Sequence, residues 1–438
     1  MRMKRNHFRV VTGCIFALCL MVSLTLSTAF AAGKPVTLQF WLRDTRPSNV
    51  EAMNKIVANF EKANPGIKIK VVLTPWDSVE QKTATAIAAG TLPDLSQLNQ
   101  TGAADYGAKG VLLNLDKRYK TWADKNKVAK ISLSQAMYNG HYYAVPWFAG
   151  SNVMFYNKDL FKKAGIVDQA GNPKPPVTWD EFLENAQKLT LDTNNDGKID
   201  QWGFVVRGNV SLTIPVREFM LAAGDGDWVD TAHGNKVVVD SPKNIKGMQF
   251  YLDLYRKHKV TPPDVPSIDY VAEEQYFLSG KVAMMFNGPW NLGNMYASKI
   301  NWGVALEPKS ERHAAHIGGC PVGIFKTTKH PNEAWKFATY LLSDEAQQIW
   351  AIKYGCGLPA TKKAQEDAKK DPVIKVFVES LQYAERDGVT PPPQIAQWVT
   401  IEQSVAPPIF QKALLGEINA KQAVQELEAA IKNVMKKK

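Results

Sequence analysis

The sequence predicts an α/β protein made of at least two interleaved domains. Apolar runs typical of strands alternate with helical apolar spacing from residue 36 to residue 98, and such alternation predicts a parallel sheet covered by helices. The chain of 438 residues is too long for one ordinary hydrophobic core. No low-complexity linker divides it, so we expect the chain to cross between its domains more than once.

Residues 1–31 have the pattern of a secretory signal peptide. Four basic residues precede an apolar run over 10–26, and Ala29-Phe30-Ala31 places small residues where a signal peptidase cuts. About 17 apolar positions followed by small residues fit export better than a membrane anchor. We therefore predict an exported protein, soluble after cleavage near Ala31, in the periplasm or on the exterior of the cell envelope.

The net charge does not predict a nucleic-acid partner. The precursor carries +11, and loss of the four basic residues of the signal leaves about +7. The lysines are spread along the chain, and neither a zinc finger, an RNP motif nor a basic helix appears. We expect a solvated basic surface facing an anionic cell envelope.

The first elements follow from local signals. Val36 to Trp41 reads as a strand, and Ser48-Asn49-Val50-Glu51 has the spacing of a capping box that opens a helix. Asn64-Pro65-Gly66 ends that helix. The next predicted elements are a strand over 67–73, a helix over 81–89 ended by Gly90, and a strand over 95–98.

Later helices are predicted in the same way. Thr178 to Glu181 forms a second capping box that opens a helix to about residue 190. Gly280 supplies a left-handed C-cap before a short buried strand, and Gly288-Pro289 then turns the chain and presents Trp290. Further helices are expected over 242–258, 332–342, 344–353 and 420–435.

The sequence does not indicate an enzyme. It has no Gly-x-Ser-x-Gly elbow, no phosphate-binding Gly-Lys-Ser/Thr loop and no His-Glu-x-x-His helix. Glu273 and Glu274 are neighbours on a predicted helix, so they diverge and are expected on a solvated face rather than as a catalytic pair.

One loop has the spacing of a calcium site. Oxygen-bearing side chains alternate along it, a glycine occupies the sixth position, and the carbonyl of Lys198 takes the seventh, as in an EF-hand loop. The bidentate glutamate of the twelfth position is missing, because that residue is Gly203. A structural Ca²⁺ and an Asx-turn loop that bonds to itself are both open. The candidate ligands are Asp192, Asn194, Asp196, Lys198 and Asp200.

Two cysteines remain after removal of the signal, Cys320 and Cys356. Export favours a disulfide between them. It would close a loop of about 37 residues and stabilise the fold by about 3–4 kcal/mol in the chain-entropy model. Two free buried thiols are the alternative.

Several segments, in order along the chain, resemble those of the family 1 extracellular solute-binding proteins of carbohydrate ABC importers. Each segment is a weak signal alone, and their order and spacing make the combination specific. The segments are 89–94, 140–146, 155–165, 175–182, 277–290, 334–338 and 342–347.

The resemblance implies a type II periplasmic-binding-protein fold, in which two α/β lobes flank a ligand cleft and join at a hinge. It places 32–149 plus 306–350 in the N-terminal lobe and 150–305 plus 351–438 in the C-terminal lobe.

A subset of aromatic and polar residues is expected to bind the ligand. Indoles pack on sugar C–H faces while polar groups bind hydroxyls, and ligands of open α/β sheets lie beyond the carboxyl ends of strands. The resemblance adds Trp290 and Trp398, whose counterparts stack on sugar; a core tryptophan is the alternative interpretation of each. The predicted ligand-binding residues are Trp41, Arg43, Asp44, Asn99, Trp147, Trp290 and Trp398.

The resemblance also implies a function. A monomeric receptor would capture a mono- or oligosaccharide by hinge closure and deliver it to ABC permease subunits with a cytoplasmic ATPase, without a required cofactor. The alternatives are a secreted carbohydrate-active enzyme and a binding protein for a non-sugar solute.

Overall fold

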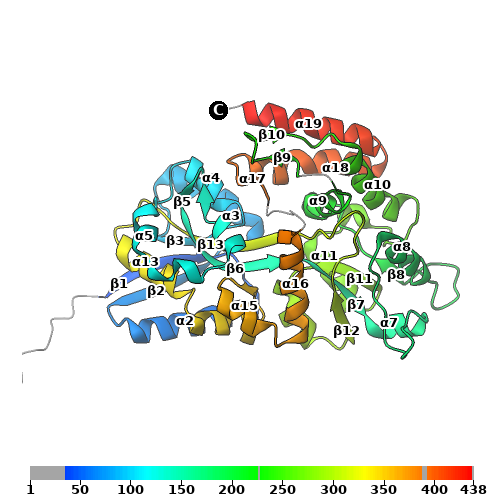
Figure 1. Cartoon of the computed structure of the whole chain (residues 1–438), viewed down its shortest axis with the longest axis horizontal. Coiled ribbons are helices and arrows are strands. Elements are labelled where there is room, and N and C mark those ends of the chain that lie inside the picture. The colour runs from blue at the N-terminus through cyan, green and yellow to red at the C-terminus, as the bar shows by residue number, and fades with distance from the viewer. Residues whose placement is uncertain (1–34, 225–226, 387–391, 437–438) are drawn as a thin grey trace, which may run out of the picture.

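The computed structural model describes residues 35–224, 227–386 and 392–436. The predicted signal peptide lies outside this range. The described chain forms two lobes side by side, each built on its own sheet and covered by helices (Figure 1). In the described part, no helix combines the length and apolar character needed to cross a membrane.

The first lobe is built on a six-stranded sheet with the order β14-β6-β13-β3-β1-β2. β1 pairs in parallel with β2 and β3, whereas β13 is antiparallel to both β3 and β6. Its elements are β1 (Val36–Leu42), α2 (Pro47–Ala63), β2 (Ile67–Leu73), α3 (Trp76–Ala89), β3 (Leu95–Gln97), α4 (Gly102–Ala108), α5 (Asp116–Thr121), η1 (Ala123–Lys127), α6 (Lys130–Ser134), β4 (Met137–Tyr138), β5 (His141–Tyr142), β6 (Ala144–Ser151), β13 (Ile317–Ile324), α13 (Pro331–Tyr340), α14 (Asp344–Gln347), the π-helical turn η5 (Gln348–Lys353), β14 (Leu358–Pro359) and α15 (Lys362–Ala368).

The second lobe is built on a four-stranded sheet with the order β12-β7-β11-β8. Its elements are β7 (Val153–Asn157), α7 (Lys158–Lys163), α8 (Trp179–Lys188), β8 (Trp202–Phe204), η2 (Val210–Leu212), α9 (Thr213–Ala222), β9 (Val229–Asp230), β10 (Lys236–Val237), α10 (Pro242–Arg256), η3 (Val265–Ser267), α11 (Tyr270–Leu278), β11 (Val282–Asn287), η4 (Pro289–Asn291), α12 (Leu292–Ala297), β12 (Trp302–Ala305), α16 (Pro372–Arg386), α17 (Trp398–Thr400), η6 (Ile401–Val405), α18 (Ala406–Leu415) and α19 (Ala420–Lys436).

Local chemistry explains where the helices begin and end, with one correction. The capping box expected at residues 48–51 is wrong: α2 begins at Pro47, and its N-cap Arg46 makes no side-chain cap. Proline suits the first helical position because its φ is preset and its missing N–H would have had no partner there. The box at Thr178 and Glu181 is confirmed in α8, and Gly280 has the expected positive φ of 74°.

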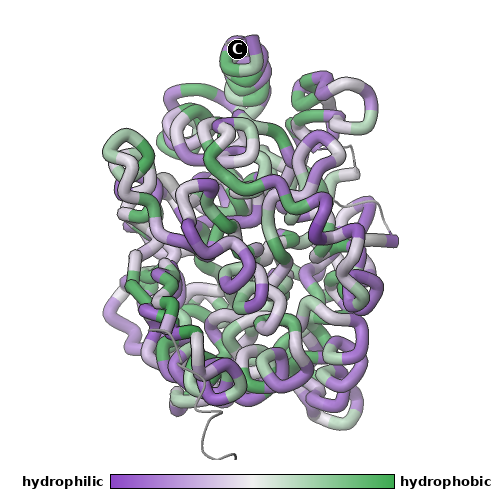
Figure 2. The backbone as a smooth tube through the Cα atoms, turned by 90° about the vertical axis from the view of Figure 1, so that its left-hand side faces the viewer, coloured by the Kyte–Doolittle hydropathy of each residue, from purple (hydrophilic) through white to green (hydrophobic). Residues whose placement is uncertain are grey.

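Alternating strand faces and helical stripes build the cores. Phe40 in β1 meets Trp147 and Phe337 edge to face in the first lobe. In α19 the residues Leu427 and Ile431, four positions apart, are buried on one face, and both hydrophobic and hydrophilic colours appear on the coil next to the C-terminus (Figure 2).

Within the described residues, three crossovers connect the lobes, at residues 151–153, 305–317 and 368–372. One strand departs from the expected division of the chain. The segment from residue 351 onward was expected in the C-terminal lobe, yet β14 pairs with β6 in the first sheet. The chain therefore leaves the first lobe after α15, and α16 then lies between the two sheets (Figure 1).

Glu218 in α9 holds two of these crossovers together. Its Oε1 accepts hydrogen bonds from Nδ2 of Asn152 and from the backbone N–H of His316, each at 2.6 Å. The backbone N–H of Asn152 also donates to the carbonyl of His316 at 3.0 Å. Ser380 of α16 braces the same point by donating to the carbonyl of Asn152 at 3.0 Å. One carboxyl oxygen thus fixes the register of the hinge.

Buried carboxyl groups surround this clamp. Glu273 pairs with Arg207 at 3.0 Å, and both side chains are almost fully buried. Burial raises the pKa of Glu218 and of Glu273 to about 7, against the attraction of Arg207. Burial also raises the pKa of Glu307, with the neighbouring Glu218 adding to the shift.

The prediction that Glu273 and Glu274 lie on a solvated face is therefore wrong. Both residues are buried, because α11 turns them toward Arg207 and Asn294 rather than toward water.

The two cysteines are free, buried thiols, so the disulfide favoured by the sequence is not formed. Cys320 lies in β13 and Cys356 lies just before β14, with β6 between these two strands. Two inter-strand spacings amount to about 10 Å, which exceeds the roughly 7 Å between Cα atoms that a disulfide spans. Burial raises the pKa of the Cys320 thiol to about 12, which keeps it protonated.

The hinge clamp predicts different effects for two substitutions of Glu218 at pH 5. Glu218→Ala leaves two buried donors without an acceptor, which should lower the free energy of unfolding by about 2–4 kcal/mol. Glu218→Gln keeps an oxygen for both donors and should lie within about 1 kcal/mol of the wild type. Urea titration measures the free energy of unfolding of both variants. Equal losses of stability in Glu218→Ala and Glu218→Gln would contradict the clamp.

The same carboxyl predicts a pH dependence. Because the pKa of Glu218 is raised from 4.5 to about 7 in the folded protein, the folded state holds more protons than the unfolded state between these values. Stability should therefore fall as the pH rises from about 4.5 to 7. Glu218→Gln should flatten part of this fall, so that it is more stable than the wild type at pH 8. An identical pH profile of Tm for both proteins would contradict the assignment.

Candidate ligand-binding site between the lobes

Polar residues gather where the parallel strands of the first lobe end. Arg43 and Asp44 follow β1, and Asn99 follows β3. The backbone N–H of Arg43 donates to Oε1 of Gln97 at 2.9 Å, which ties the end of β1 to β3. Three predicted residues, Arg43, Asp44 and Asn99, therefore lie at one edge of the sheet, as the parallel arrangement requires.

Glu80 in α3 connects the members of this edge. It accepts from Nη1 of Arg43 at 2.7 Å and from Nδ2 of Asn99 at 3.3 Å, and the hydroxyl of Tyr106 donates to its other oxygen. Burial opposes the ionisation of Glu80, but Arg43 and the donated hydrogen bonds hold its pKa below the usual value. Glu80 is thus a charged acceptor that orients its neighbours.

Asp44 begins a chain of contacts that crosses to the second lobe. Both oxygens of its carboxylate accept hydrogen bonds from Nη1 of Arg46, at 2.9 and 2.8 Å. Burial raises the pKa of Asp44, and the charge of Arg46 opposes that shift. Arg46 also donates to the hydroxyl of Tyr270 in α11, and that hydroxyl donates to Oδ1 of Asn291 at 3.1 Å. These groups hold the two lobes against each other.

Trp290 lies between the lobes on the turn after β11. Its indole N–H donates to Oδ1 of Asn287 at 2.9 Å, and Nδ2 of Asn287 donates to Glu273 at 3.1 Å. The ring lies against bare backbone of the first lobe, since a Cβ added at Gly150 would be 3.0 Å from it. A Cβ at Gly288 would be 2.3 Å from the ring, so the turn requires glycine there. The indole is half-buried and fixed in orientation.

Trp398 lies deeper at the same interface. It is almost fully buried beside Trp228 and the guanidinium of Arg217, and its indole N–H donates to Glu402 at 2.7 Å. Its helix α17 packs against α4 of the first lobe. Nearby, Nε2 of Gln394 donates to the carbonyl of Gln100 at 3.2 Å and links the lobes again.

Two predicted ligand residues do not lie at this interface. Trp41 lies beneath α3, where Lys82 covers its ring at 4.4 Å and Gln39 accepts its indole N–H. Trp147 is fully buried in the core of the first lobe against Trp350 and Phe148. Both side chains project from strand faces that are covered by helices. Such side chains support the fold rather than face a ligand.

Four interface residues were not predicted from the sequence: Arg46, Glu80, Tyr270 and Asn291. Arg46 and Tyr270 are partners across 224 positions of the chain, so no local pattern connects them. Asn291 directly follows Trp290, which was predicted to stack on the sugar. Its position next to that residue was the only hint in the sequence that Asn291 lies at the interface.

The predicted calcium loop is held by its own hydrogen bonds. The carboxylate of Asp192 accepts from the backbone N–H groups of Asp196 and Gly197, and Asp200 accepts from Thr193. These are Asx-turn contacts. The carboxyl and amide oxygens suit Ca²⁺, but the site lacks a bidentate twelfth ligand because Gly203 lies in β8. Within the described residues, no group of three His, Cys, Asp or Glu is arranged to hold a metal ion.

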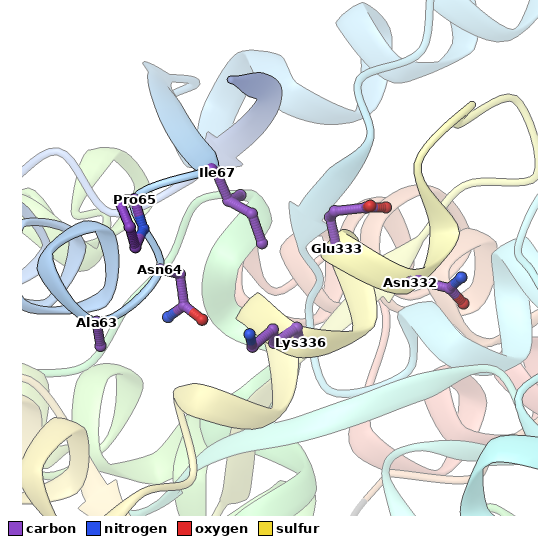
Figure 3. A pocket seen from close by; sticks show the side chains of 8 residues that line it. Ala63, Asn64, Pro65, Ile67, Asn332, Glu333 and Lys336 are labelled. Carbon is purple, nitrogen blue, oxygen red and sulfur yellow. The ribbon is translucent and has the colours of Figure 1, made fainter. Parts of the chain in front are cut away.

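A separate hollow of about 410 Å³ lies on the first lobe. It is lined by Asn64 from the turn after α2 and by Asn332, Glu333 and Lys336 of α13, of which Lys336 lies nearest to Asn64 in Figure 3. Ile67 begins β2, so the hollow lies at the amino end of that strand. It is therefore remote from the carboxyl edge that carries Arg43 and Asp44.

The interface offers the groups that bind a polar, uncharged ligand with apolar faces. Its indoles present flat apolar surfaces, and its amides, carboxylates and guanidinium groups present directional donors and acceptors. Among the described atoms, Nε and Nη2 of Arg43, Nδ2 of Asn291 and Oε1 of Gln394 are buried without a hydrogen-bond partner. Buried polar groups of this kind are costly unless a ligand or water meets them.

Comparisons with known proteins agree with this architecture. The chain is 30% identical over 321 residues to a binding protein of Brucella abortus, covering 71% of this chain and 72% of that protein. It is 25% identical to the maltotriose-binding protein of Pyrococcus abyssi, covering 77% and 70%. An ABC transporter solute-binding protein of Thermotoga lettingae, solved with α-D-tagatose, is 28% identical with a TM-score of 0.79, covering 92% of this chain and 99% of that one.

These similarities confirm the two-lobed periplasmic-binding-protein fold that the sequence predicted. A sequence profile described as bacterial extracellular solute-binding protein matches residues 46–348, which is more than half of the chain. The chain therefore belongs to the bacterial extracellular solute-binding protein family.

Proposed function

We propose that this protein is an extracytoplasmic receptor that binds a carbohydrate between its lobes and delivers it to the permease of an ABC importer. The observation that carries the proposal is Trp290. Its indole N–H is fixed on Asn287 and its ring lies between the lobes. A flat, oriented indole beside amides and charged groups is the combination that binds a sugar ring.

Closure of the lobes is the proposed mechanism. The lobes are connected only through narrow crossovers among the described residues, and Asp44, Arg46 and Tyr270 meet across the interface. A ligand that contacts both lobes binds the closed form more tightly, so it shifts the equilibrium toward closure. The closed form then docks on the permease, and the energy for transport comes from that transporter's ATPase.

The relatives support a carbohydrate as the ligand class. The similar proteins include a maltotriose-binding protein, two arabino-oligosaccharide-binding proteins and a protein solved with α-D-tagatose. These sugars differ in ring and length but share vicinal hydroxyls and C–H faces. We propose the same class here, bound by a monomer, with an exported location that follows from the predicted signal peptide and cleavage near Ala31.

We also propose that the loop from Asp192 to Asp200 binds a structural Ca²⁺. Its alternating carboxylate and amide oxygens support this. The ion would brace the loop between α8 and β8 and would take no part in sugar binding, because this loop lies outside the interface groups described above.

Trp290→Ala should weaken sugar binding while the protein stays folded. Loss of the indole face should lower the affinity about 10- to 100-fold, as for an aromatic group at the centre of an interface. Isothermal titration calorimetry with a glycan panel measures this, and the panel should show saturable binding to the wild type without shortened products after long incubation.

Trp202→Ala is the matched control, because Trp202 is equally half-buried in the second lobe but packs on Tyr276 away from the interface. It should keep the wild-type affinity. Unfolding of Trp290→Ala at room temperature would instead show that Trp290 is a core residue.

Calcium should raise the thermal stability if the loop binds it. A ligand at 100 times its Kd stabilises by about 2.7 kcal/mol, so Tm should rise by at least about 2 °C when calcium chloride replaces EGTA. Asp196→Ala should abolish the rise. Asp168→Ala should keep it, because Asp168 caps a similar exposed Asx turn elsewhere. The same Tm with and without calcium in the wild type would refute this site.

A further inference from the structure

Trp76 is the most exposed tryptophan of the chain. It is 40% exposed, whereas the other eleven are buried or half-buried. It begins α3 just beyond the carboxyl end of β2. That position lies at the same edge of the sheet as Arg43 and Asn99, which follow β1 and β3. An exposed indole at the edge that binds ligands in this type of fold needs a reason, because burying it elsewhere would stabilise the protein.

Arg43 lies directly beside this indole. Its guanidinium carbon is 5.3 Å from the centroid of the Trp76 ring, and the side chain is 1% exposed. Nη1 is bonded to Glu80 at 2.7 Å. Nε and Nη2 are buried and have no hydrogen-bond partner. Buried, charged donors without acceptors are costly, and a ligand with hydroxyl oxygens would satisfy them.

The surroundings hold Arg43 in this orientation. Glu80 also accepts from Asn99 at 3.3 Å and from the hydroxyl of Tyr106, so its carboxylate is fixed from three sides. From the second lobe, Gln394 reaches the carbonyl of Gln100, next to Asn99, and its Oε1 has no partner. The place thus combines an apolar platform with two donors of Arg43 that have no acceptor.

We propose that Trp76 and Arg43 form an outer sugar subsite, and that the ligand is therefore an oligosaccharide of at least two units. One unit packs on Trp290 and another packs on Trp76, with the free N–H groups of Arg43 donating to its hydroxyls. The two indoles lie at opposite ends of a chain of contacts that runs through Asp44, Arg46, Tyr270 and Asn291. This inference rests on the proposed sugar-binding function.

Family membership alone does not decide the length of the ligand. One similar structure holds the monosaccharide α-D-tagatose, and another relative is named for maltotriose. The second platform in this chain distinguishes between these cases, because a monosaccharide occupies one indole only.

Calorimetry with a series of increasing chain length tests the subsite. The probes are glucose, maltose, maltotriose and maltotetraose, with arabinose and arabinotriose as a second series. In a series that binds, the wild-type affinity should rise with length. Trp76→Ala should lower the affinity for the trisaccharide at least 10-fold and that for the monosaccharide less than 2-fold. Trp76→Phe should recover part of the loss, since it keeps an aromatic face.

Two further variants separate the subsite from general damage. Leu73→Ala removes an exposed apolar side chain at the end of β2 and should change no affinity. Arg43→Lys keeps a charge for Glu80 but removes the free Nε and Nη2 donors, so it should repeat the length-dependent loss. Far-UV circular dichroism checks that each variant is folded.

The outcomes distinguish the two levels of the account. Length-dependent losses in Trp76→Ala and Arg43→Lys support the subsite. If the wild type binds sugar and Trp76→Ala either keeps the wild-type affinity or loses the same factor of affinity for every chain length, the subsite is overturned. The proposed sugar receptor then remains in place. Absence of wild-type binding to both series and to the broader glycan panel overturns the receptor and the subsite together.

Discussion

The pairing of arginines with carboxylates within each lobe is the constraint that fixes the groups facing the other lobe. Arg43 pairs with Glu80, Arg46 with Asp44, Arg207 with Glu273 and Arg217 with Asp227. The guanidinium groups of Arg43, Arg207 and Arg217 are almost fully buried and that of Arg46 is partly buried, and an unpaired buried charge would cost several kcal/mol. Because removing either member of a pair leaves the other uncompensated, the strands and helices that carry them must meet in one arrangement. The positions of the binding groups follow from that arrangement.

The hinge and the site share this charged network. Glu218 clamps two crossovers, and Arg207 lies between it and Glu273, which in turn holds Asn287 and so the turn of Trp290. A movement of the crossovers therefore acts on the same groups that orient the proposed sugar platform. This physical connection explains how a small ligand between the lobes can bias the position of whole domains.

Local chemistry made much of the fold predictable. Strand and helix alternation, the Thr178 cap and the left-handed Gly280 depend on neighbouring residues, and the structure has them. Arg43, Asp44, Asn99 and Trp290 lie at the interface between the lobes, where strand ends and the resemblance placed them, and their role in binding stays a prediction. Trp41 and Trp147 were placed wrongly, because the face on which a strand residue points depends on which helix covers it. Arg46 with Tyr270, and the burial of Glu273, depend on partners far away in the chain, which no local pattern reveals.

The central claim is that a sugar bound between the lobes closes the hinge. Small-angle X-ray scattering of the wild-type protein, with and without a saturating sugar identified by calorimetry, tests it most directly. The account predicts a smaller radius of gyration with the sugar and no such change in Trp290→Ala at the same sugar concentration. Saturable sugar binding with an unchanged radius of gyration in the wild type would contradict closure as the mechanism.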